Sequence, residues 1–376
     1  MTTSSEKTSS SSGKTLVTGG AGFIGSRVVR RLLDEERDVR VLILPGEDTR
    51  NLAGLDVEIV EGDVTDAESL KKGVAGCSRV FHLAAIYSDW LPRPEKMYEV
   101  NCIGSLNILW ESLRNDVEKV VYTSSVVALG PAREGLATEE TMFTAWPTNM
   151  EYARSKWLSE QEARTFCNNG LDVSFCCPGM PYGAGDIGPT PTGKFLLTAA
   201  KTMPKILPDN YMSVVDVDDV ARGHLLAEKK GRNGESYILT GENILISEFL
   251  QTIASLVGKE VNPLRISPKL MHVLAPIGDY LEQRAYKIKK RPPVTGGAMR
   301  YAALNFRYDN RKAREELGMV FTPMRVALAK SFDWFIREGY IKDQGFISAF
   351  EKHGAKELAN TRVDLASNQP SVHARV

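Results

Sequence analysis

Tyr152 and Lys156 stand four residues apart, inside a stretch whose pattern predicts a helix over residues 151–168. Residues at this spacing share one face of a helix, so the two side chains would lie side by side. A phenol has a reference pKa of about 10, and a neighbouring ammonium lowers that pKa because it favours the phenolate. Such a pair can pass a proton to or from a substrate oxygen. An ordinary solvated helix face is the alternative interpretation of the same spacing.

Two serines, Ser124 and Ser125, follow Thr123 at the end of a strand predicted over residues 119–123. Ligands of parallel sheets bind at the carboxyl ends of the strands, and a hydroxyl there can polarise a carbonyl or hold an alcohol. Serine and threonine are also common at strand ends for turn formation alone. The serines therefore point to chemistry only in combination with the other motifs.

A glycine-rich stretch, TGGAGFIG at residues 18–25, lies between a predicted strand that begins at Leu16 and a predicted helix that begins at Ser26. Glycines allow a tight turn and a close approach of phosphate oxygens, and the helix start offers unpaired N–H groups and a positive dipole end. No Lys-Ser or Lys-Thr pair follows Gly25, so the stretch is not the phosphate loop of a triphosphate site. It predicts a dinucleotide site.

Alternating strands and helices must position these motifs between residues 15 and 183. The predicted strands begin at Leu16 and continue at residues 39–44, 57–60, 80–83, 119–123 and 173–177, and the predicted helices cover residues 26–36, 67–74, 97–113 and 151–168. Strands that are almost continuously apolar belong to a parallel sheet covered on both faces. Right-handed crossovers then give an α/β fold with a doubly wound, Rossmann-type sheet.

The remaining chain is predicted to form a smaller, mostly helical substrate part that is interleaved with the first. Residues 186–208 are rich in Gly, Pro, Thr and Lys, and residues 214–220 look like a return to the sheet. Further elements are predicted as a helix running on to Leu226, a strand at 237–239, and helices at 247–257, 270–284, 310–316 and 325–338. We expect a dinucleotide-binding domain over 15–185, completed by about 212–240, and a substrate-binding part over 186–211 and 241–345. Residues 1–14 and 353–376 are predicted to be disordered tails.

Composition excludes several classes of function. The 376 residues carry 47 basic and 47 acidic side chains, so the net charge indicates neither a nucleic-acid nor an anionic membrane partner. The five cysteines form no C-x-x-C pair and no metal-ligand spacing, which predicts no metal site and a reducing, cytoplasmic compartment. The chain shows no secretory signal and no apolar stretch near the ~18 residues needed for a membrane span.

The order of these motifs resembles that of the extended short-chain dehydrogenases/reductases, the NAD-dependent epimerase/dehydratase family. The resemblance covers roughly residues 15 to 340 and is carried by residues 18–25, 62–64 (GDV), 82–85 (HLAA), Asn101, 123–125 (TSS), Tyr152 with Lys156, 178–179 (PG) and 217–221 (VDDVA). Within this superfamily the chain is similar to dihydroflavonol reductase-like and 3β-hydroxysteroid dehydrogenase-like proteins. Residues 122–130, 189–194 and 219–226 also resemble the hopanoid-associated sugar epimerases.

The resemblance implies a role for each matching residue. Tyr152 would be the general acid/base, Lys156 would lower its pKa and hold the nicotinamide ribose, and Ser125, with Ser124 as the alternative, would orient the substrate. The implied cofactor site consists of Gly19, Gly22, Phe23, Ile24, Gly25, Asp63, Val64, Leu83, Ala84, Ala85, Lys156, Pro178 and Gly179. Within it Asp63 would accept from the adenine amino group, and Pro178 and Gly179 would lie beside the nicotinamide carboxamide.

The chain departs from the family pattern at the residue that usually decides between the two nicotinamide cofactors. NAD sites usually carry an acidic residue after the second strand, and NADP relatives often carry an arginine; this chain has Leu44. Either Arg50 or Arg40 could reach a 2′-phosphate, so the sequence favours NADP, with NAD as the alternative. A second departure is Cys177, which precedes Pro178 where relatives often have an arginine.

Two reactions compete, with a non-catalytic cofactor sensor as a third and weaker interpretation. The first is hydride transfer between NAD(P) and a secondary alcohol or ketone of a lipophilic or phenolic small molecule, such as a steroid, terpenoid or flavonol. The second is epimerisation or dehydration of a nucleotide sugar with tightly bound NAD. A sugar diphosphate calls for paired cations, and the substrate segment offers three lysines but no arginine. An apolar lining is expected instead from Met180, Phe195, Leu196, Leu197, Met203 and Tyr211, which favours the first reaction.

Other residues carry weaker expectations. His82 is predicted to pack in an apolar strand, Asn101 to hydrogen-bond near the active site or to face solvent, and Trp90 to wall the substrate pocket or to lie exposed. The basic run KIKKR at residues 287–291 is predicted to be a solvated helix end. The resemblance also suggests a homodimer through residues 97–113 and 151–168.

Overall fold

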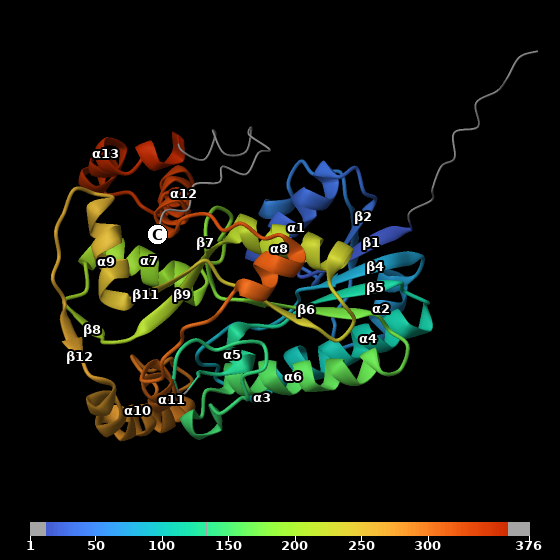
Figure 1. Cartoon of the computed structure of the whole chain (residues 1–376), viewed down its shortest axis with the longest axis horizontal. Coiled ribbons are helices and arrows are strands. Elements are labelled where there is room, and N and C mark those ends of the chain that lie inside the picture. The colour runs from blue at the N-terminus through green and yellow to red at the C-terminus, as the bar shows by residue number, and fades with distance from the viewer. Residues whose placement is uncertain (1–12, 133, 360–376) are drawn as a thin grey trace, which may run out of the picture.

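The computed structural model describes residues 13–132 and 134–359. Its centre is a seven-stranded sheet in the order β10-β6-β5-β4-β1-β2-β3, in which all neighbours run parallel (Figure 1). The strands are β1 (Lys14–Thr18), β2 (Val39–Ile43), β3 (Glu58–Glu61), β4 (Cys77–His82), β5 (Lys119–Thr123), β6 (Val173–Pro178) and β10 (Ser236–Leu239). The strand order reverses beside β1, and this is where a doubly wound sheet opens its ligand crevice.

Helices cover both faces of this sheet, which confirms the predicted fold class (Figure 1). On one face lie α1 (Phe23–Asp34) and α8 (Val217–Lys230), whose apolar residues share a core with the strands. On the other face lie α2 (Ala67–Val74), α4 (Ser105–Arg114) and α6 (Glu151–Cys167). Strands buried on both sides have no polar face to show to solvent, which explains their continuous apolar runs.

The expectation that residues 214–220 return to the central sheet is wrong. Strand β9 (Tyr211–Asp216) belongs to a separate three-stranded sheet, parallel to β7 (Met180–Tyr182) and antiparallel to β11 (Glu242–Leu245). The strand ends at Asp216, because the carboxylate of this residue caps the next helix by accepting from the Asp218 N–H at 2.8 Å. The central sheet is extended instead by β10.

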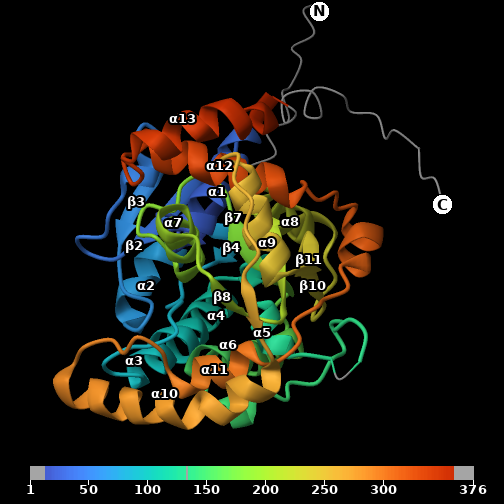
Figure 2. The same cartoon turned by 90° about the vertical axis from the view of Figure 1, so that its left-hand side faces the viewer.

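The second half of the chain builds its own hydrophobic core beside the carboxyl ends of the central strands (Figures 1 and 2). Its helices are α7 (Pro191–Thr202), α9 (Ile246–Ser255), α10 (Pro268–Ile288), α11 (Gly296–Ala302), α12 (Met324–Arg337) and α13 (Gln344–His353), and β8 (Ile206–Pro208) pairs with β12 (Leu264–Ile266). Helix α7 was missing from the predicted elements. It begins where Thr190 caps the Gly193 N–H and Pro191 takes the first helical position.

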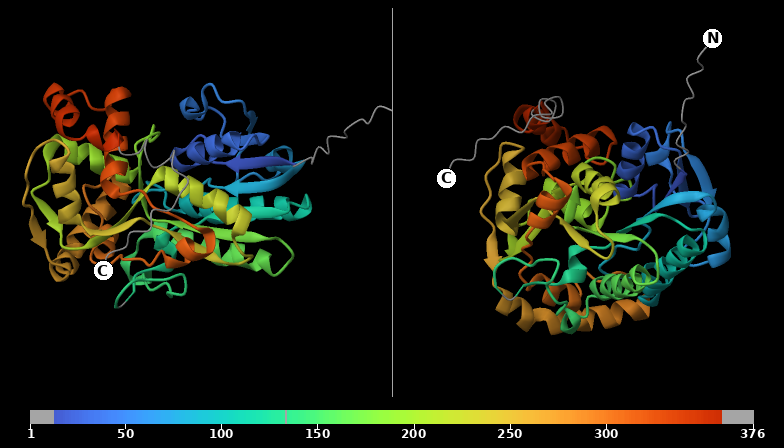
Figure 3. Two further views of the ribbon diagram at one scale, coloured as in Figure 1. Left: turned by 45° about the horizontal axis from the view of Figure 1, so that its top comes forward. Right: turned by 45° about the vertical axis from the view of Figure 1, so that its right-hand side comes forward.

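The boundary expected for the C-terminal tail is also wrong for the part that the structure describes. Residues 356–359 are helical, and the Glu357 carboxylate accepts from the Arg325 guanidinium at 2.8 Å. Leu358 packs against the core of the second half. Residues 360–376, like residues 1–12, lie outside the described chain (Figure 3).

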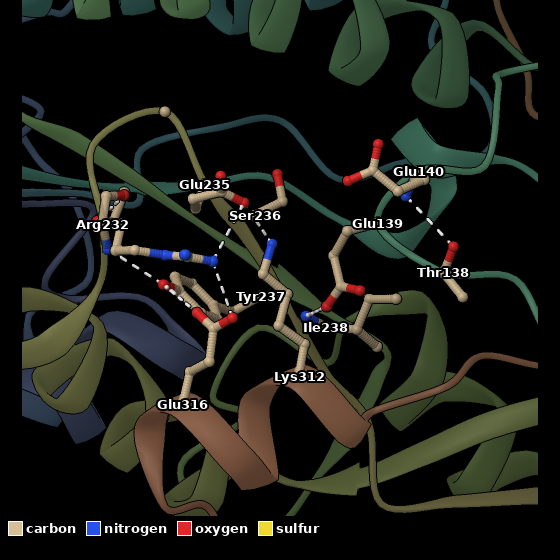
Figure 4. Close-up of polar contacts among 12 residues, drawn as sticks. Thr138, Glu139, Glu140, Arg232, Glu235, Ser236, Tyr237, Ile238, Lys312 and Glu316 are labelled. Atoms are coloured by element: carbon tan, nitrogen blue, oxygen red, sulfur yellow. Dashed lines mark hydrogen bonds and ion pairs between the residues drawn. The ribbon is translucent and has the colours of Figure 1, made fainter.

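The outermost strand β10 is protected along its open edge by side chains from other segments. Glu139 accepts from the Ile238 N–H at 2.9 Å, so this edge donor is paired by a carboxylate rather than by another strand (Figure 4). Arg232 and Tyr237 both bond to Glu316, at 2.8 and 3.1 Å. Covered edges prevent unwanted strand pairing.

The helix predicted over residues 97–113 is one continuous helical run with a π-helical segment inside it. It consists of α3 (Glu95–Tyr98), the π segment Glu99–Gly104 and α4. Within the described residues, no helix is both long enough and apolar enough to cross a lipid bilayer.

Candidate active site

A cavity of about 460 Å³ opens at the carboxyl ends of the central strands. Every residue that the sequence assigned to catalysis or cofactor binding lines this one cavity, although the assignments span more than 150 positions of the chain. They are Gly19, Gly22, Phe23, Ile24, Gly25, Asp63, Val64, Leu83, Ala84, Ala85, Ser124, Ser125, Tyr152, Lys156, Pro178 and Gly179. The sequence did not single out Glu47, Ile86, Tyr87 or Lys96, which also line it.

The glycine turn is shaped by close backbone contacts. Gly19 has a φ of +67°, and a Cβ on it would lie 2.8 Å from the Ala84 nitrogen. A Cβ on Gly25 would lie 2.1 Å from the Gly19 carbonyl oxygen, so neither position accepts a side chain. Helix α1 then begins with no side-chain cap and no acidic residue in its first turn. Its N–H groups and positive dipole end are therefore free to bind an anion such as a pyrophosphate.

A series of buried hydrogen bonds holds the end of β4 against β1. The Thr18 hydroxyl lies 2.8 Å from His82 Nδ1 and accepts from the Leu83 and Ala84 N–H groups, each at 3.2 Å. His82 Nε2 lies 2.9 Å from the Ser105 hydroxyl, and burial lowers the pKa of the imidazole to about 3. His82 is thus neutral and hydrogen-bonded at both nitrogens, whereas the sequence suggested simple packing.

Asn101, in the π segment, holds the next stretch of the cavity wall. Its amide pairs with both backbone groups of Ile86, accepting from the N–H at 2.7 Å and donating to the carbonyl at 3.1 Å. The same amide nitrogen donates to the Ser155 hydroxyl at 3.0 Å. Asn101 therefore ties the cavity loop to helix α6, which confirms the hydrogen-bonding alternative over a solvent-facing asparagine.

Tyr152, Ser125 and Lys156 meet in the cavity. The Ser125 side chain lies beside that of Tyr152, and the Tyr87 ring lies 4.8 Å from the Tyr152 ring. Burial raises the pKa of Tyr152 to about 12, and the neighbouring Ser125 side chain acts in the opposite direction. Lys156 is 3% exposed and donates to the Thr123 carbonyl at 2.7 Å, and burial lowers its pKa to about 8. The expected lowering of the tyrosine pKa by Lys156 is not what these contacts produce, because the ammonium points to Thr123.

The two serines have different partners. The Ser124 hydroxyl donates to the carboxylate of Glu160, a residue that is 2% exposed. Glu160 is neutralised on its other side by Arg164 at 2.7 Å. Ser125 instead caps the short helix α5 (Val126–Leu129) by accepting from the Val127 N–H, and its side chain lies beside Tyr152. The structure therefore favours Ser125 over Ser124 as the serine available to a substrate.

An acidic residue that the sequence analysis did not single out, Glu47, lies shortly after the end of β2. The Glu47 carboxylate turns back to accept from the Leu44 N–H at 2.9 Å, and both residues line the cavity. The two arginines suggested for a 2′-phosphate are engaged elsewhere. Arg40 donates to the carbonyls of residues 72, 73 and 75, and Arg50 pairs with Asp48 at 2.8 Å. The P-G-E-D turn after the strand was the available signal, since a carboxylate three residues on can fold back.

These observations match what comparison with known proteins finds. The NAD-dependent epimerase/dehydratase family matches residues 15–240, which is more than half of the chain. The chain belongs to this family. It is therefore an enzyme of the NAD-dependent oxidoreductase and epimerase type, built on a Rossmann sheet. No group of His, Cys, Asp and Glu side chains in the described ranges could hold a metal ion.

Two named relatives and one solved structure are similar to this chain over most of its length. Sterol demethylase protein B of Methylococcus capsulatus is 33% identical over 327 residues, covering 87% of this chain and 99% of that protein. The 3beta-hydroxysteroid-dehydrogenase/decarboxylase isoform 1 of Arabidopsis thaliana is 28% identical over 356 residues, covering 85% and 79%. The crystal structure of gox2253 is 34% identical with a TM-score of 0.78, covering 87% of this chain and 99% of that one.

The residues present fit the dinucleotide that the family name implies. The glycine turn leaves a cradle that side chains would fill, and the uncapped start of α1 faces it. Asp63 keeps a carboxylate oxygen for a ligand, because Thr65 bonds only to its Oδ1, from both the N–H and the hydroxyl at 2.8 Å. Gly179 is also confined, since a Cβ on it would lie 2.7 Å from the Ser213 carbonyl oxygen.

Two alanine variants distinguish the roles of Ser124 and Ser125. Ser125→Ala should lower kcat by about tenfold to a hundredfold because the substrate oxygen would lose the hydroxyl beside Tyr152, with a small loss of stability. Ser124→Ala should lower the free energy of unfolding by about 1–3 kcal/mol, because the buried Glu160 Oε2 loses its hydrogen-bond donor, while kcat changes less. Denaturant titrations and steady-state rates would measure both effects. The reverse pattern would assign the substrate contact to Ser124.

Proposed function

We propose that this enzyme transfers a hydride between NAD and a secondary alcohol or ketone carbon of a lipophilic small molecule. The observation that carries the proposal is that Ser125 and Tyr152 lie beside each other in the cavity wall, with Lys156 buried on the same helix as Tyr152. Two hydroxyls that meet in one wall can both contact a single substrate oxygen. When bound, the nicotinamide supplies or accepts the hydride.

The proton would pass through Tyr152. With its pKa raised to about 12, Tyr152 is protonated at neutral pH and is ready to donate to a carbonyl oxygen as reduction proceeds. Ser125 would hold that oxygen by a second hydrogen bond. Lys156, buried and cationic below its pKa of about 8, would contact the nicotinamide ribose.

The substrate side of the cavity supports an apolar ligand with few oxygens, although not through the residues first expected. Of those, Met180 lines the cavity, whereas Phe195, Leu196, Leu197 and Met203 pack in the core of the second half. Ile86, Tyr87, Val126, Val127 and Pro181 supply the apolar wall.

Charge placement argues against a nucleotide sugar. The cationic groups lining the cavity are Lys96 and Lys156, whereas Lys194, Lys201 and Lys205 do not contribute to its wall. A sugar diphosphate needs two or more well-placed cations beyond those that serve the cofactor. The names of two relatives refer to sterols or hydroxysteroids, which agrees with a lipophilic substrate.

Epimerisation or dehydration of a nucleotide sugar remains the second candidate, because the family takes its name from those reactions. Turnover against a panel of hydroxysteroids, ketones and nucleotide sugars, followed by nicotinamide absorbance, separates the two. Net oxidation or reduction of added cofactor with a ketone or alcohol supports the proposal. A sugar isomerised or dehydrated without net cofactor change would overturn it.

We also propose that the enzyme is a cytoplasmic homodimer, paired through α4 and α6.

We further propose NAD rather than NADP as the cofactor, because Glu47 stands where the adenosine ribose is expected and both candidate arginines are occupied. A carboxylate accepts from ribose hydroxyls and repels a 2′-phosphate. Fluorescence titration should show NADH binding at least about tenfold tighter than NADPH.

Glu47→Gln should narrow this preference by weakening the repulsion, while Glu61→Gln, an exposed change on β3 outside the cavity, serves as the matched control. Tighter binding of NADPH to the unmodified enzyme would refute the assignment. An unchanged ratio in Glu47→Gln would show that the carboxylate does not contact the ribose.

A further inference from the structure

Helix α10 has two apolar faces, but only one of them is covered. Its inner face packs on α11, where Gly278 approaches so closely that a Cβ would lie 2.5 Å from the Gly296 nitrogen. An ion pair between Asp279 and Arg300, at 2.7 Å, fastens the same face. Figures 1 and 2 show α10 along the outside of the molecule, opposite α13.

The outer face of α10 carries an apolar stripe, which exposed Arg284 interrupts between Tyr280 and Ile288. Its residues, with their exposed fractions, are Leu270 (45%), Val273 (72%), Ile277 (57%), Tyr280 (57%) and Ile288 (64%). Intervals of three, four, three and eight residues keep all five on one side of a helix. A 21-residue helix is about 30 Å long, and the stripe occupies positions along most of it. It is therefore more extensive than single apolar residues scattered over a protein surface. Such a face needs a partner.

The exposed charges around the stripe are all positive. They are Lys269, Arg284, Lys287, Lys289, Lys290 and Arg291. The two acidic residues of the helix are engaged by neighbours: Asp279, whose side chain is 40% exposed, pairs with Arg300, and the half-buried Glu282 accepts from the Tyr286 hydroxyl at 3.1 Å. The balanced net charge of the chain conceals this local excess, which is why composition alone gave no sign of an anionic partner.

We propose that the outer face of α10 binds the surface of an anionic lipid bilayer, with the apolar stripe inserted among the acyl chains and the lysines at the headgroups. Apolar side chains flanked by Lys and Arg are the composition of helices that lie in the membrane interface. A second copy of the chain fits less well. An isologous pairing of two such faces would bring the six cations of one copy against those of the other, with fewer acidic groups to compensate.

The position of α10 links membrane binding to the active site, if the proposed lipophilic substrate is correct. The Trp90 ring lies 5.7 Å from the Tyr286 ring of α10, and Arg291 pairs with Asp89 at 2.6 Å. The same loop contributes Ile86 and Tyr87 to the cavity wall. A bound bilayer would therefore lie beside the loop that borders the substrate, which shortens the path of a membrane-dissolved molecule into the cavity.

Cosedimentation of the full-length protein with vesicles tests the proposal. The protein should bind vesicles of phosphatidylglycerol mixed with phosphatidylcholine, and bind pure phosphatidylcholine vesicles at least about tenfold more weakly. The double variant Val273→Glu/Ile277→Glu should lose most of the binding, because it places charge in the middle of the stripe. Lys289→Gln/Lys290→Gln should weaken binding to anionic vesicles alone and reduce the salt dependence.

Val320→Glu is the matched control, since Val320 is 70% exposed and lies outside α10. Because the altered side chains of α10 are exposed, circular dichroism and turnover of a water-soluble substrate should be unchanged in every variant. Failure of the unmodified protein to bind anionic vesicles would overturn the proposal, as would undiminished binding of Val273→Glu/Ile277→Glu. Sedimentation velocity showing a dimer that this variant dissociates would assign the face to a second copy instead. Vesicle binding is measured without turnover, so its outcome is independent of the reaction assigned.

Discussion

Replacing Tyr152 with phenylalanine should lower kcat by roughly two to four orders of magnitude, the usual contribution of a positioned general acid. The reason is specific to one atom. The phenylalanine ring would keep its place 4.8 Å from Tyr87, but neither Ser125 nor a substrate carbonyl would find a hydroxyl there. NADH affinity should change little, because the glycine turn is untouched. Stopped-flow hydride transfer and fluorescence titration measure the two quantities separately.

Tyr98→Phe is a suitable control for that experiment. Tyr98 is also partly buried and donates to a carboxylate, that of Glu151, but it does not line the cavity. Its loss should leave kcat within a small factor of the unmodified enzyme. Retained turnover in Tyr152→Phe would remove Tyr152 from the proton path, and a matching loss in Tyr98→Phe would point to general destabilisation of this end of α6.

Substituting alanine for Gly25 should damage the enzyme in a different way. The added methyl would lie 2.1 Å from the Gly19 oxygen and 2.9 Å from the Gly20 Cα, and both atoms belong to the backbone. Since neither can rotate away, the turn must shift. We expect the free energy of unfolding to fall by about 1–3 kcal/mol. We expect kcat/KM to fall by about a hundredfold or more, the cost of a misplacement of about 1 Å.

Gly188→Ala offers the comparison, because a Cβ at Gly188 meets no atom within 4 Å and the residue is exposed. Thermal unfolding with and without NADH should show normal stabilisation by cofactor in Gly188→Ala and a much reduced stabilisation in Gly25→Ala. Equal cofactor stabilisation in the two variants would mean that the turn tolerates a side chain and that the pyrophosphate lies elsewhere.

Sequence patterns predicted those parts of the site that depend on local spacing. The glycine turn and the pair Tyr152 and Lys156 are each contained within eight residues, and helix or turn geometry alone brings their atoms together. The predicted doubly wound sheet was sufficient to collect these segments at one edge. The sequence favoured Ser125 and kept Ser124 as the alternative, because the partner that engages Ser124 is Glu160, 36 residues away.

Other features depend on contacts that no local pattern contains. Glu47 enters the cavity only because its side chain folds back onto Leu44. The direction of the Lys156 ammonium is decided by the Thr123 carbonyl, so the electrostatic effect inferred from spacing did not follow. The apolar residues of α7 were assigned to the cavity because their character was evident, whereas the side on which they pack was not.

The π segment Glu99–Gly104 makes the site sensitive to the number of residues in the chain as well as to their identity. A π turn holds one extra residue, which rotates everything beyond it by about 100° relative to a regular helix. Deleting a single residue near the exposed Ile103 would restore the regular winding and swing Asn101 away from Ile86 or α4 away from the sheet. A residue deleted from a loop leaves the rotational positions of residues within the neighbouring helices unchanged. A residue deleted from this π segment would change those positions, and we expect it to impair function.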